Sequence, residues 1–581
     1  MSARDKVLVI GDDTRSFLAT VRSLGRQGLE VHAAPFDFGA PALASRYIAT
    51  THFLPYYLDG GLAWLDAIQT LLREHRFAMV VPCDERGLLP LCLHRDVLAP
   101  LSALAIPSPE ALDIYFDKVR TRELAQSCDV AVAHGRMLAP DDSVERIEAD
   151  IGLPVVIKEP MSYALPELYV RTSTRIVETR AALQAWLDKH DHGAGPILLE
   201  QMFPGAGVGV SVLCHKGAVL QAFEHQRAHE LNGSGYYRKS MPLDPARLAA
   251  VERMVRASHY TGLAMFEFKV GPDGWILIEV NARPWGSLPL PVSIGVDFPY
   301  RLYLLLALGQ ATVPVSYPAG RYCRNLVLDM WQARSAAAGM TRTPLKLAAH
   351  CLSWAWGLHR VLIGRERQDT LVLDDPRPGL REVRELIGGR MGALRERLRP
   401  AAVPLGAGLE RRLAELVNGA GGRPLEVLFI CQGNINRSSY AELKAGQLFD
   451  AAHLRFSSAG MLPRNRRGSP AVAIGAAARH GVSMSAHRSR HASAELLEAA
   501  DLVIAFDHIN LDAVAARYPH LRHRIFLLGD VLPAGDSQIR DPEGRDETTF
   551  LTTYQRIDDC LTALARSAGA SDAQLRKTTT C

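Results

Sequence analysis

The stretch "VLFICQGNINRSSYAELKAG", residues 427–446, passes from an apolar run through a polar loop into a helical pattern. Cys431, Arg437 and Ser438 give the loop the form Cys-x5-Arg-Ser. The apolar residues after the loop recur at helical spacing, i, i+4, i+7 and i+8: Ala441, Ala445, Leu448 and Phe449. The stretch therefore predicts a strand, a loop and a helix, the unit from which parallel α/β sheets are built.

This loop carries the groups that thiolate chemistry on phosphate requires. Its backbone N–H groups are predicted to form an anion nest, and the following helix adds its positive N-terminus. Together with Arg437 they favour the thiolate form of Cys431, and Arg437 can hold two phosphate oxygens bidentately. Asn434 tolerates unusual dihedral angles and its side chain can staple the loop. Further along, "QIRDPEG" supplies Asp541 as the acid for the leaving oxygen, with Pro542 fixing the turn.

These residues resemble the low-molecular-weight protein tyrosine phosphatases over residues 425–568. The segments that match in order are "RFSSAG" (455–460), "HGVSMSAHRSR" (480–490), "ADLVIAFD" (500–507) and "RIFLLGD" (524–530). The resemblance implies a doubly wound, four-stranded parallel sheet and hydrolysis of a phosphate monoester through a phosphocysteine. It implies these roles: nucleophile Cys431, phosphate clamp Arg437, thiolate partner Ser438, loop residue Asn434 and general acid Asp541.

The sequence departs from that family at the walls of the predicted pocket. Asn436 stands where many members have a second cysteine, so a protective vicinal disulfide is not available. Glu543 follows Asp-Pro where an aromatic residue is common, and "MLPRNRRG" replaces the other aromatic wall. With Arg464, Arg466 and Arg467 nearby, these departures favour a phosphate smaller or more anionic than phosphotyrosine.

Length and composition place this loop in a larger, ordinary globular chain. Its 581 residues suggest three or four domains, and its apolar (48%) and charged (22%) fractions are typical of globular proteins. A net charge of +4 gives no argument for a nucleic-acid partner. The nine cysteines are scattered without a Cys-x-x-Cys pair, which is intracellular usage rather than a disulfide framework or a cysteine zinc site. The start, "MSARDKVLVIGDD", has no long apolar core, so we expect a cytoplasmic location.

Residues 1–105 are predicted to form a parallel, Rossmann-like α/β domain. The run "KVLVI" (6–10) precedes a helical pattern and then a second strand, "LEVHAA", and the alternation continues toward "FAMVVPCDE" (77–85). The first turn, "GDD", lacks the Gly-x-Gly-x-x-Gly fingerprint. We therefore expect this scaffold to bind no dinucleotide.

Residues 106–320 change to a helix followed by antiparallel strands, and one hairpin carries chemistry. In "FEFKVGPDGWILIEVNAR" (266–283) the turn "GPDG" brings Glu267 opposite Glu279, with Asn281 on the same face. Three oxygen ligands on one sheet face suit Mg²⁺, which binds through a few carboxylates and phosphate oxygens. Arg283 extends from the same face and can neutralise a transferring phosphoryl group.

The segments "DKVRTRELAQSCDVAVA", "LPVVIKEP", "ILLEQMFPG" and "HQRAHE", followed by this hairpin, resemble the ATP-grasp fold. They are most similar to the carbamoyl-phosphate-synthase-like carboxylate–amine ligases, over residues 1–320. The resemblance implies that ATP phosphorylates a carboxylate and that an amine or similar nucleophile then attacks the acyl phosphate. It implies these roles: Lys118 and Lys158 on ATP phosphates; Glu200, Gln201 and Met202 along the adenine pocket; Glu267, Glu279 and Asn281 on two Mg²⁺ (or Mn²⁺) ions; Arg227 and Arg283 on the γ-phosphate and acyl phosphate.

Residues 321–422 are predicted to be a basic helical connector. Between 331 and 400 there are 13 Lys or Arg against 7 Asp or Glu. The apolar run "LKLAAHCLSWAWGLHRVLIG" (345–364) favours a helix packed between the two catalytic domains, and the alternative is weak contact with a membrane surface through its tryptophans and basic residues. "NGAGGRP" (418–424) is predicted to lead into the phosphatase domain, 423–570, which a tail, 571–581, follows.

The sequence thus predicts an α/β multidomain, bifunctional enzyme: an ATP-grasp (α+β) ligase behind a Rossmann-like domain, then a phosphatase. Its expected partners are a small carboxylate, an amine and a phosphorylated protein or metabolite. One alternative is a signalling phosphatase whose ATP-grasp half only senses nucleotide. The intact Glu267, Glu279, Asn281, Arg283 and both lysines favour a ligase over a sensor. An arsenate-reductase-like enzyme ranks last, because it needs further reactive cysteines near the loop.

Overall fold

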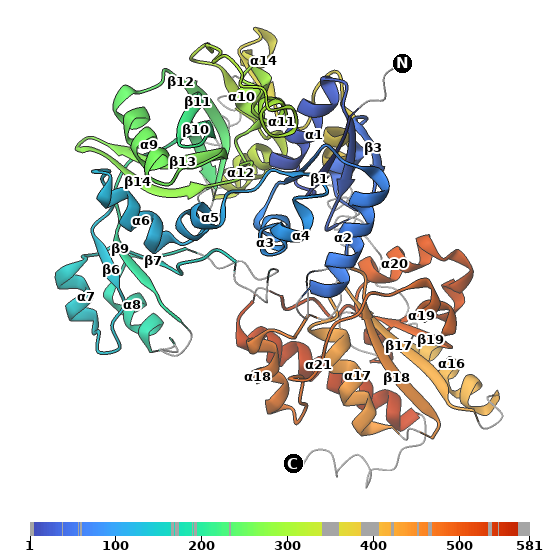
Figure 1. The fold of residues 1–581 in the computed structure, drawn as a ribbon. Helices are drawn as coiled ribbons and strands as arrows, with labels where there is room; N and C mark the ends of the chain where they lie inside the picture. Colours follow the sequence, from blue (N-terminus) through green and yellow to red (C-terminus); the bar gives the residue numbers. More distant parts are fainter. Residues whose placement is uncertain are drawn as a thin grey trace. The chain divides into compact units, whose positions relative to one another are not determined.

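The computed structural model divides the chain into two compact units, 1–392 and 393–581, and each is described by itself. In Figure 1 the first unit runs from blue to yellow and the second from light orange to red. The structure describes residues 5–37, 39–55, 57, 61–163, 168, 174–188, 190, 195–231, 234–339, 359–384, 406–419, 423–449, 452–462, 467–532, 537–543 and 545–567.

The first unit begins with a parallel five-stranded sheet of order β3-β2-β1-β4-β5, which confirms the predicted Rossmann-like domain. Alternate strand residues are buried on both faces: Val7 and Val9 pack toward α1, whereas Leu8 and Ile10 pack toward α2. The strands are β1 (Lys6–Ile10), β2 (Glu30–Ala34), β3 (Ile48–Thr51), β4 (Met79–Pro82) and β5 (Ala103–Leu104). The helices are α1 (Ser16–Arg26), α2 (Leu62–His75), α3 (Glu85–Leu93) and α4 (Arg95–Leu98).

Two further sheets with flanking helices follow, as the predicted α+β fold requires. A four-stranded sheet of order β6-β9-β7-β8 packs against α7 (Val144–Asp150) and α8 (Arg180–Leu187) around a small apolar core. Its strands are β6 (Gly135–Met137), β7 (Val155–Lys158), β8 (Arg175–Val177) and β9 (Leu198–Gln201). A seven-stranded sheet has the order β14-β13-β10-β11-β12-β15-β16.

The core of the larger sheet forms beneath α9 and beside α5 and α6, where buried residues of β10, β13 and β14 meet them. The strands are β10 (Ala206–His215), β11 (Ala218–Leu231), β12 (Ser234–Met241), β13 (Gly262–Gly271) and β14 (Gly274–Asn281). The helices of this part of the chain are α5 (Pro109–Tyr115), α6 (Lys118–Ser127), α9 (Pro245–Ala257), α10 (Pro289–Ser293) and α11 (Phe298–Leu308).

The structure differs from the predicted helical connector between residues 321 and 384. Besides α12 (Leu326–Gly339) and α14 (His359–Leu362), this segment contributes β15 (Tyr322–Arg324) and β16 (Glu366–Gln368) to the edge of the seven-stranded sheet. Buried ion pairs hold it there: Arg238 with Asp369 at 2.5 Å, Arg22 with Asp375 at 2.9 Å and Arg324 with Glu366 at 2.7 Å.

Several charged residues of this segment are buried within the first unit, among them Glu366, Asp369 and Asp375. Most of 345–364, where a membrane contact was the alternative, lies outside the described residues. In the part of the chain that the structure describes, we find no helix that is both long and apolar enough to cross a membrane.

The second unit is built on a parallel sheet of order β18-β17-β19-β20, which confirms the predicted four-stranded phosphatase fold. One face packs against α17 and α21, and the other packs against α19 and α20. The strands are β17 (Leu425–Cys431), β18 (Leu454–Gly460), β19 (Leu502–Ala505) and β20 (Ile525–Leu527). The helices are α16 (Gly406–Gly419), α17 (Arg437–Leu448), α18 (Ala471–Arg479), α19 (Ala494–Ala499), α20 (His508–Arg517) and α21 (Glu547–Ser567).

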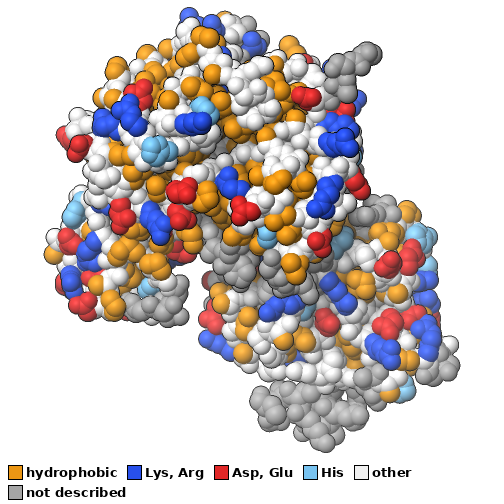
Figure 2. All heavy atoms as spheres, in the orientation of Figure 1, with side chains coloured by type: hydrophobic (Ala, Val, Ile, Leu, Met, Phe, Trp, Pro, Cys, Tyr) orange, Lys and Arg blue, Asp and Glu red, His pale blue; other side chains and the backbone are white. Residues whose placement is uncertain are grey.

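Charged side chains are interspersed on the surface. Figure 2 shows basic and acidic groups mixed on the face of each unit that it draws, in keeping with the small net charge of +4.

Candidate active sites

Cys431 ends β17, and the loop that follows it turns donors toward its sulfur. The backbone N–H of Asn434 donates to Cys431 Sγ at 3.3 Å, and Ser438 Oγ lies 3.0 Å from the same sulfur. Cys431 is buried, with 1% of its surface exposed. The loop then enters α17 at Arg437, which places the helix N-terminus beside the thiol.

Asn434 holds the shape of this loop. Its φ angle is +52°, a left-handed conformation that asparagine tolerates better than most residues. Its amide nitrogen donates to Ser438 Oγ at 2.9 Å and to Ser458 Oγ at 2.7 Å, and its amide oxygen accepts from the Arg490 N–H at 2.9 Å. A side chain in place of Gly460 on β18 would come within 3.0 Å of the Asn434 backbone nitrogen. The loop is therefore fixed from both sides by neighbouring strands and turns.

Arg437 points to two carboxylates beside the loop. Its guanidinium donates to Asp541 at 2.7 Å, to Asp507 at 2.6 Å and to the Ile539 carbonyl at 2.8 Å, and the residue is 1% exposed. The structure thus brings Asp541, selected from its Asp-Pro motif, next to Cys431 and Arg437. Sequence reasoning missed Asp507, although it ends the segment "ADLVIAFD", and the carboxyl end of a strand beside the loop was the available signal.

The two departures noted in the sequence contact each other. Asn436 is the N-cap residue of α17, and its amide nitrogen donates to Glu543 Oε2 at 2.7 Å. The Glu543 N–H in turn donates to Asp541 Oδ1 at 3.2 Å. Asn436 therefore ties the Asp541 turn to the phosphate loop. Of the three predicted basic residues, Arg467 is described, whereas Arg464 and Arg466 lie outside the described residues.

The hairpin of the first unit places its acidic residues in register. Glu267 on β13 lies directly opposite Glu279 on β14, and a bulge follows between Glu267 and Phe268. The Asn281 amide donates to Glu267 Oε1 at 3.0 Å, and Arg227 on β11 forms an ion pair with the same carboxylate. Burial raises the pKa of Glu267 to about 7, against the opposing effect of Arg227. Two facing carboxylates and a neighbouring amide on one sheet face fit a site for a hard divalent cation, which binds oxygen ligands.

A cavity lies beside this hairpin, between the Rossmann-like domain and the larger sheet. Lys118, Glu279, Asn281 and Arg283 all line it, so four of the predicted residues share one space. Lys118 Nζ donates to the Glu159 carbonyl at 3.0 Å and to Ser162 Oγ at 3.2 Å. The remaining lining residues are Glu85, Tyr115, Phe116, Thr121, Ser162, Tyr163, Val280 and Ala282.

Glu85 is the residue of this cavity that sequence reasoning missed. It follows the carboxyl end of β4, and its carboxylate pairs with Arg283 at 2.7 Å. The signal was "VVPCDERG", an acidic cluster just after a buried parallel strand, where open α/β sheets bind their ligands. Arg283 is thus held by a carboxylate from the preceding domain.

Lys158 and the proposed adenine-pocket residues do not line this cavity. Lys158 on β7 pairs with Glu200 on β9 at 2.5 Å, and Arg122 pairs with the same carboxylate at 3.0 Å. Met202 is 41% exposed and Gln201 is also exposed. The structure therefore groups Lys158 with Glu200 as an ion pair across the smaller sheet.

The two sites define the class of the chain. One unit has a Cys-x5-Arg loop between the first strand and helix of a parallel four-stranded sheet, and the other has paired sheets whose hairpin carries acidic residues at a cavity. Residues 426–579 match the family model for low molecular weight phosphotyrosine protein phosphatase. Residues 194–322 match the family model described as ATP-grasp in the biosynthetic pathway with Ter operon. The chain therefore contains a region that matches an ATP-grasp family and a region that matches the low molecular weight phosphotyrosine protein phosphatase family, and both families are enzymes.

Curated and solved proteins resemble separate parts of the chain. The protein-arginine-phosphatase of Bacillus subtilis is 25% identical over 144 residues, which cover 24% of this chain and 95% of that protein. The low molecular weight protein-tyrosine-phosphatase Etp of Escherichia coli is 29% identical over 132 residues, which cover 23% and 86%. A solved N5-carboxyaminoimidazole synthetase from Staphylococcus aureus, complexed with ADP, aligns with a TM-score of 0.43 at 13% identity over 54% of this chain and 81% of that one.

Proposed function

We propose that the first unit uses ATP and Mg²⁺ to convert a carboxylate to an acyl phosphate, which an amine or similar nucleophile then attacks. The observation that supports this proposal is the cavity shared by Lys118, Glu279, Asn281 and Arg283. Glu267, Glu279 and Asn281 would hold the metal, two ions in our proposal, and a bound divalent cation supplies charge neutralisation for phosphoryl transfer. Lys118 and Arg283 would bind phosphate oxygens. Arg227, on β11, would help to neutralise the negative charge of the transferring phosphate.

We also propose that Lys158 binds the nucleotide, although it does not line this cavity. We propose that Lys158 exchanges its partner Glu200 for a phosphate oxygen when ATP binds, since both groups are buried and Arg122 also serves Glu200. Gln201 and Met202, which are exposed on the strand end, would then contact the adenine. Mn²⁺ would substitute for Mg²⁺ at an oxygen-only site of this kind.

For the second unit we propose hydrolysis of a phosphate monoester. Cys431 Sγ attacks phosphorus while Arg437 and the loop N–H groups hold the equatorial oxygens, and Asp541 gives a proton to the leaving oxygen. Water then attacks the phosphocysteine with Asp541 as base. Ser438 and Asn434 donate toward the sulfur and so stabilise it as the attacking thiolate and as the leaving group.

The substrate that we propose for the phosphatase follows from the residues beside its loop, Asn436 and Glu543. The named relatives act on protein tyrosine or arginine phosphates, but this chain has Glu543 after Asp-Pro, bound to Asn436. A carboxylate at this position offers no stacking surface to an aryl ring. We propose a small phosphorylated metabolite or a flexible phosphoprotein segment that does not rely on aromatic stacking.

The seven described cysteines are all free, which supports a cytoplasmic location for both activities.

The ligase proposal is tested by ADP release from the full chain with Mg·ATP and a panel of small acids and amines. ADP should form with one acid–amine combination and should fall to background in Glu279→Gln. Asp273→Asn, on the exposed turn of the same hairpin, is the matched control and should behave as wild type. If no acid triggers ADP release, or if Glu279→Gln matches Asp273→Asn, this half does not act as a ligase through this site.

The phosphatase proposal is tested by hydrolysis of para-nitrophenyl phosphate. Activity should disappear in Cys431→Ser and persist in Cys560→Ala, which removes a buried thiol of α21 while leaving the loop intact. A phosphocysteine should be trapped by rapid acid quench in Asp541→Asn. Full activity in Cys431→Ser would contradict the mechanism.

A further inference from the structure

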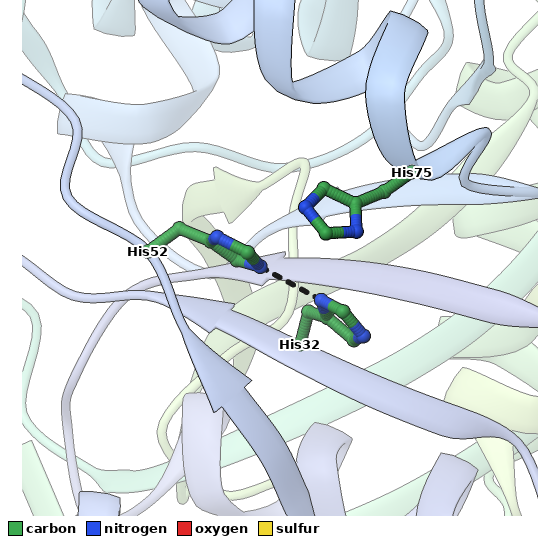
Figure 3. A group of neighbouring side chains, drawn as sticks. All are labelled: His32, His52 and His75. Atoms are coloured by element: carbon green, nitrogen blue, oxygen red, sulfur yellow. Dashed lines mark hydrogen bonds between the residues drawn. The ribbon is translucent and has the colours of Figure 1, made fainter.

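Three histidines from separate elements meet in the Rossmann-like domain. His32 lies on β2, His52 directly follows β3, and His75 is the last residue of α2. Figure 3 shows the three rings gathered at one place, with His52 and His32 joined by a hydrogen bond. His32 is 3% exposed, and the other two are half-buried, so the cluster opens to solvent on one side. None of the three lines the cavity beside the hairpin.

The ring nitrogens are close enough to share one ion. One nitrogen from each residue lies within 4.8 Å of the others, and His32 Nδ1 is 2.7 Å from His52 Nε2. Three nitrogens around tetrahedral zinc, at about 2.0–2.1 Å from the metal, are about 3.3 Å apart. Small side-chain rotations therefore convert the observed spacing into a ligand set, and the His32–His52 pair opens to admit the ion.

A carboxylate stands behind the central ligand. His32 Nε2 is 2.9 Å from Glu30 Oε1, and Lys6 is 3.8 Å from the same carboxylate oxygen. A carboxylate accepting the second ring N–H of a histidine fixes the tautomer and makes the other nitrogen a better ligand. With Nε2 protonated toward Glu30, His32 Nδ1 presents its lone pair to the centre of the cluster.

Simple aromatic packing explains this arrangement less well. His32 and His52 stack at 5.0 Å, and Phe77 contacts His32 edge-on, as core rings do. Packing alone, however, requires neither three nitrogen donors converging nor a carboxylate aligned with the outer nitrogen of the buried ring. Imidazole nitrogens without thiolate ligands suit zinc and neighbouring first-row divalent ions.

We propose that His32, His52 and His75 bind one Zn²⁺ ion, with Glu30 orienting His32 and a fourth position open to water. The ion joins β2, the segment after β3 and the end of α2, so it stabilises the first unit independently of either catalytic site. A ligand that binds only the folded state raises the melting temperature with its concentration.

The test uses the full chain in a Cys431→Ser background, so that the phosphatase thiolate does not bind zinc. Metal is removed with a chelator, and Zn²⁺ is titrated against a chromogenic competitor. The chain with all three histidines should bind one more equivalent of Zn²⁺ than the His52→Gln/His75→Gln double variant. His94→Gln is the matched control, because His94 lies in the same domain and contacts Tyr57 outside the cluster. Equal zinc binding by the double variant and the control would overturn the proposal.

Two further measurements separate a metal site from a folding defect. Glu30→Gln keeps an acceptor for His32 but loses the charge, so zinc affinity should fall about 10–100-fold while the fold is retained. In the same Cys431→Ser background, X-ray absorption of the zinc-loaded chain should show imidazole nitrogens and oxygen around the metal. A sulfur-dominated shell, or unchanged affinity in Glu30→Gln, would contradict the assignment.

Discussion

The phosphatase loop and the ATP-grasp hairpin both gather charge for phosphate, but they hold that charge in different ways. In the loop, the Asn434 backbone N–H and the Ser438 hydroxyl already lie against the Cys431 sulfur, and the Asn434 side chain holds Ser438 in place. Most of these donors are neutral and fixed by strands on both sides. The loop is therefore ready for a phosphate before one arrives, which is the condition for electrostatic catalysis without reorganisation.

In the first unit the same kinds of group are paired with one another. Glu267 pairs with Arg227, Glu200 with Lys158, and Glu85 with Arg283. Each pair neutralises a group that we propose for metal or phosphate binding. The hairpin side must therefore exchange several ion-pair partners when Mg·ATP binds, whereas in the loop only Arg437 has carboxylate partners to exchange and the neutral donors around Cys431 stay in place. The difference teaches that the phosphatase half depends on preorganisation and the ligase half on its ligands.

The largest expected effect concerns the two carboxylates on Arg437. Asp541→Asn removes the proposed acid and should lower turnover about 10²–10⁴-fold with phenyl phosphate, whose leaving group needs a proton. With para-nitrophenyl phosphate the loss should be much smaller, because that leaving group departs as an anion. The measurement is kcat for both esters.

Asp507→Asn is the matched control for this prediction, because Asp507 pairs with the same guanidinium at 2.6 Å. It should slow both esters by the same factor, since Asp507 positions Arg437 and caps α20 but gives no proton to the leaving group. If the two variants show the same dependence on the leaving group, Asp541 is not the acid.

The pairing in the hairpin predicts a large effect on stability. Arg227→Met leaves Glu267 buried without its counter-charge, and removing one partner of a buried pair costs about 3–5 kcal/mol in the free energy of unfolding. The double variant Arg227→Met/Glu267→Gln should recover much of this loss. Urea unfolding of the first unit gives both values. An Arg227→Met chain as stable as wild type would show that the hairpin site does not rely on this ion pair.

A smaller effect is expected at the contact between Asn436 and Glu543. Glu543→Ala removes an acceptor that ties the Asp541 turn to the loop, and hydrogen bonds to charged groups contribute about 1.5–3 kcal/mol. We expect kcat with phenyl phosphate to fall about tenfold or more. Glu543→Gln keeps an acceptor and should retain most of the activity. Equal losses in the two variants would mean that the charge, rather than the tie, matters.

Features of the structure could be predicted from the sequence where the residues that form them lie close together along the chain. Glu267 and Glu279 flank one tight turn, so strand alternation places them opposite each other without further information. The Cys431 loop is likewise contiguous with its strand and helix. The four-stranded parallel sheet and the Rossmann-like sheet also follow from local patterns, which the structure confirms.

Contacts between distant segments were not predictable in this way. Arg283 meets Glu85 from another domain, and Arg437 meets Asp507, which follows the neighbouring strand β19. The segment with β15 and β16 was expected to be a helical connector. The sequence could not show that its charged residues are buried, because their partners, such as Arg22 and Arg238, lie far back in the chain. The three histidines similarly come from three elements, so no short motif marks them.

The smallest expected effect is a pH dependence of the first unit through His225 on β11, which β10 separates from the hairpin. Burial, with Arg227 and Arg238 nearby, lowers the pKa of His225 to about 3. In the unfolded chain the His225 imidazole takes up a proton near pH 6.5. The neutral, buried imidazole therefore contributes its full stabilisation above that pH, and the free energy of unfolding falls below it by about 1.4 kcal/mol per pH unit. Glu267, whose pKa is raised to about 7, acts in the opposite sense, because its folded form retains a proton as pH falls from 7. His225→Gln should therefore lose less stability than wild type between pH 6.5 and 5.5 in urea unfolding, whereas exposed His134→Gln should follow wild type. Parallel curves for His225→Gln and wild type would show that the buried imidazole does not titrate as its surroundings require.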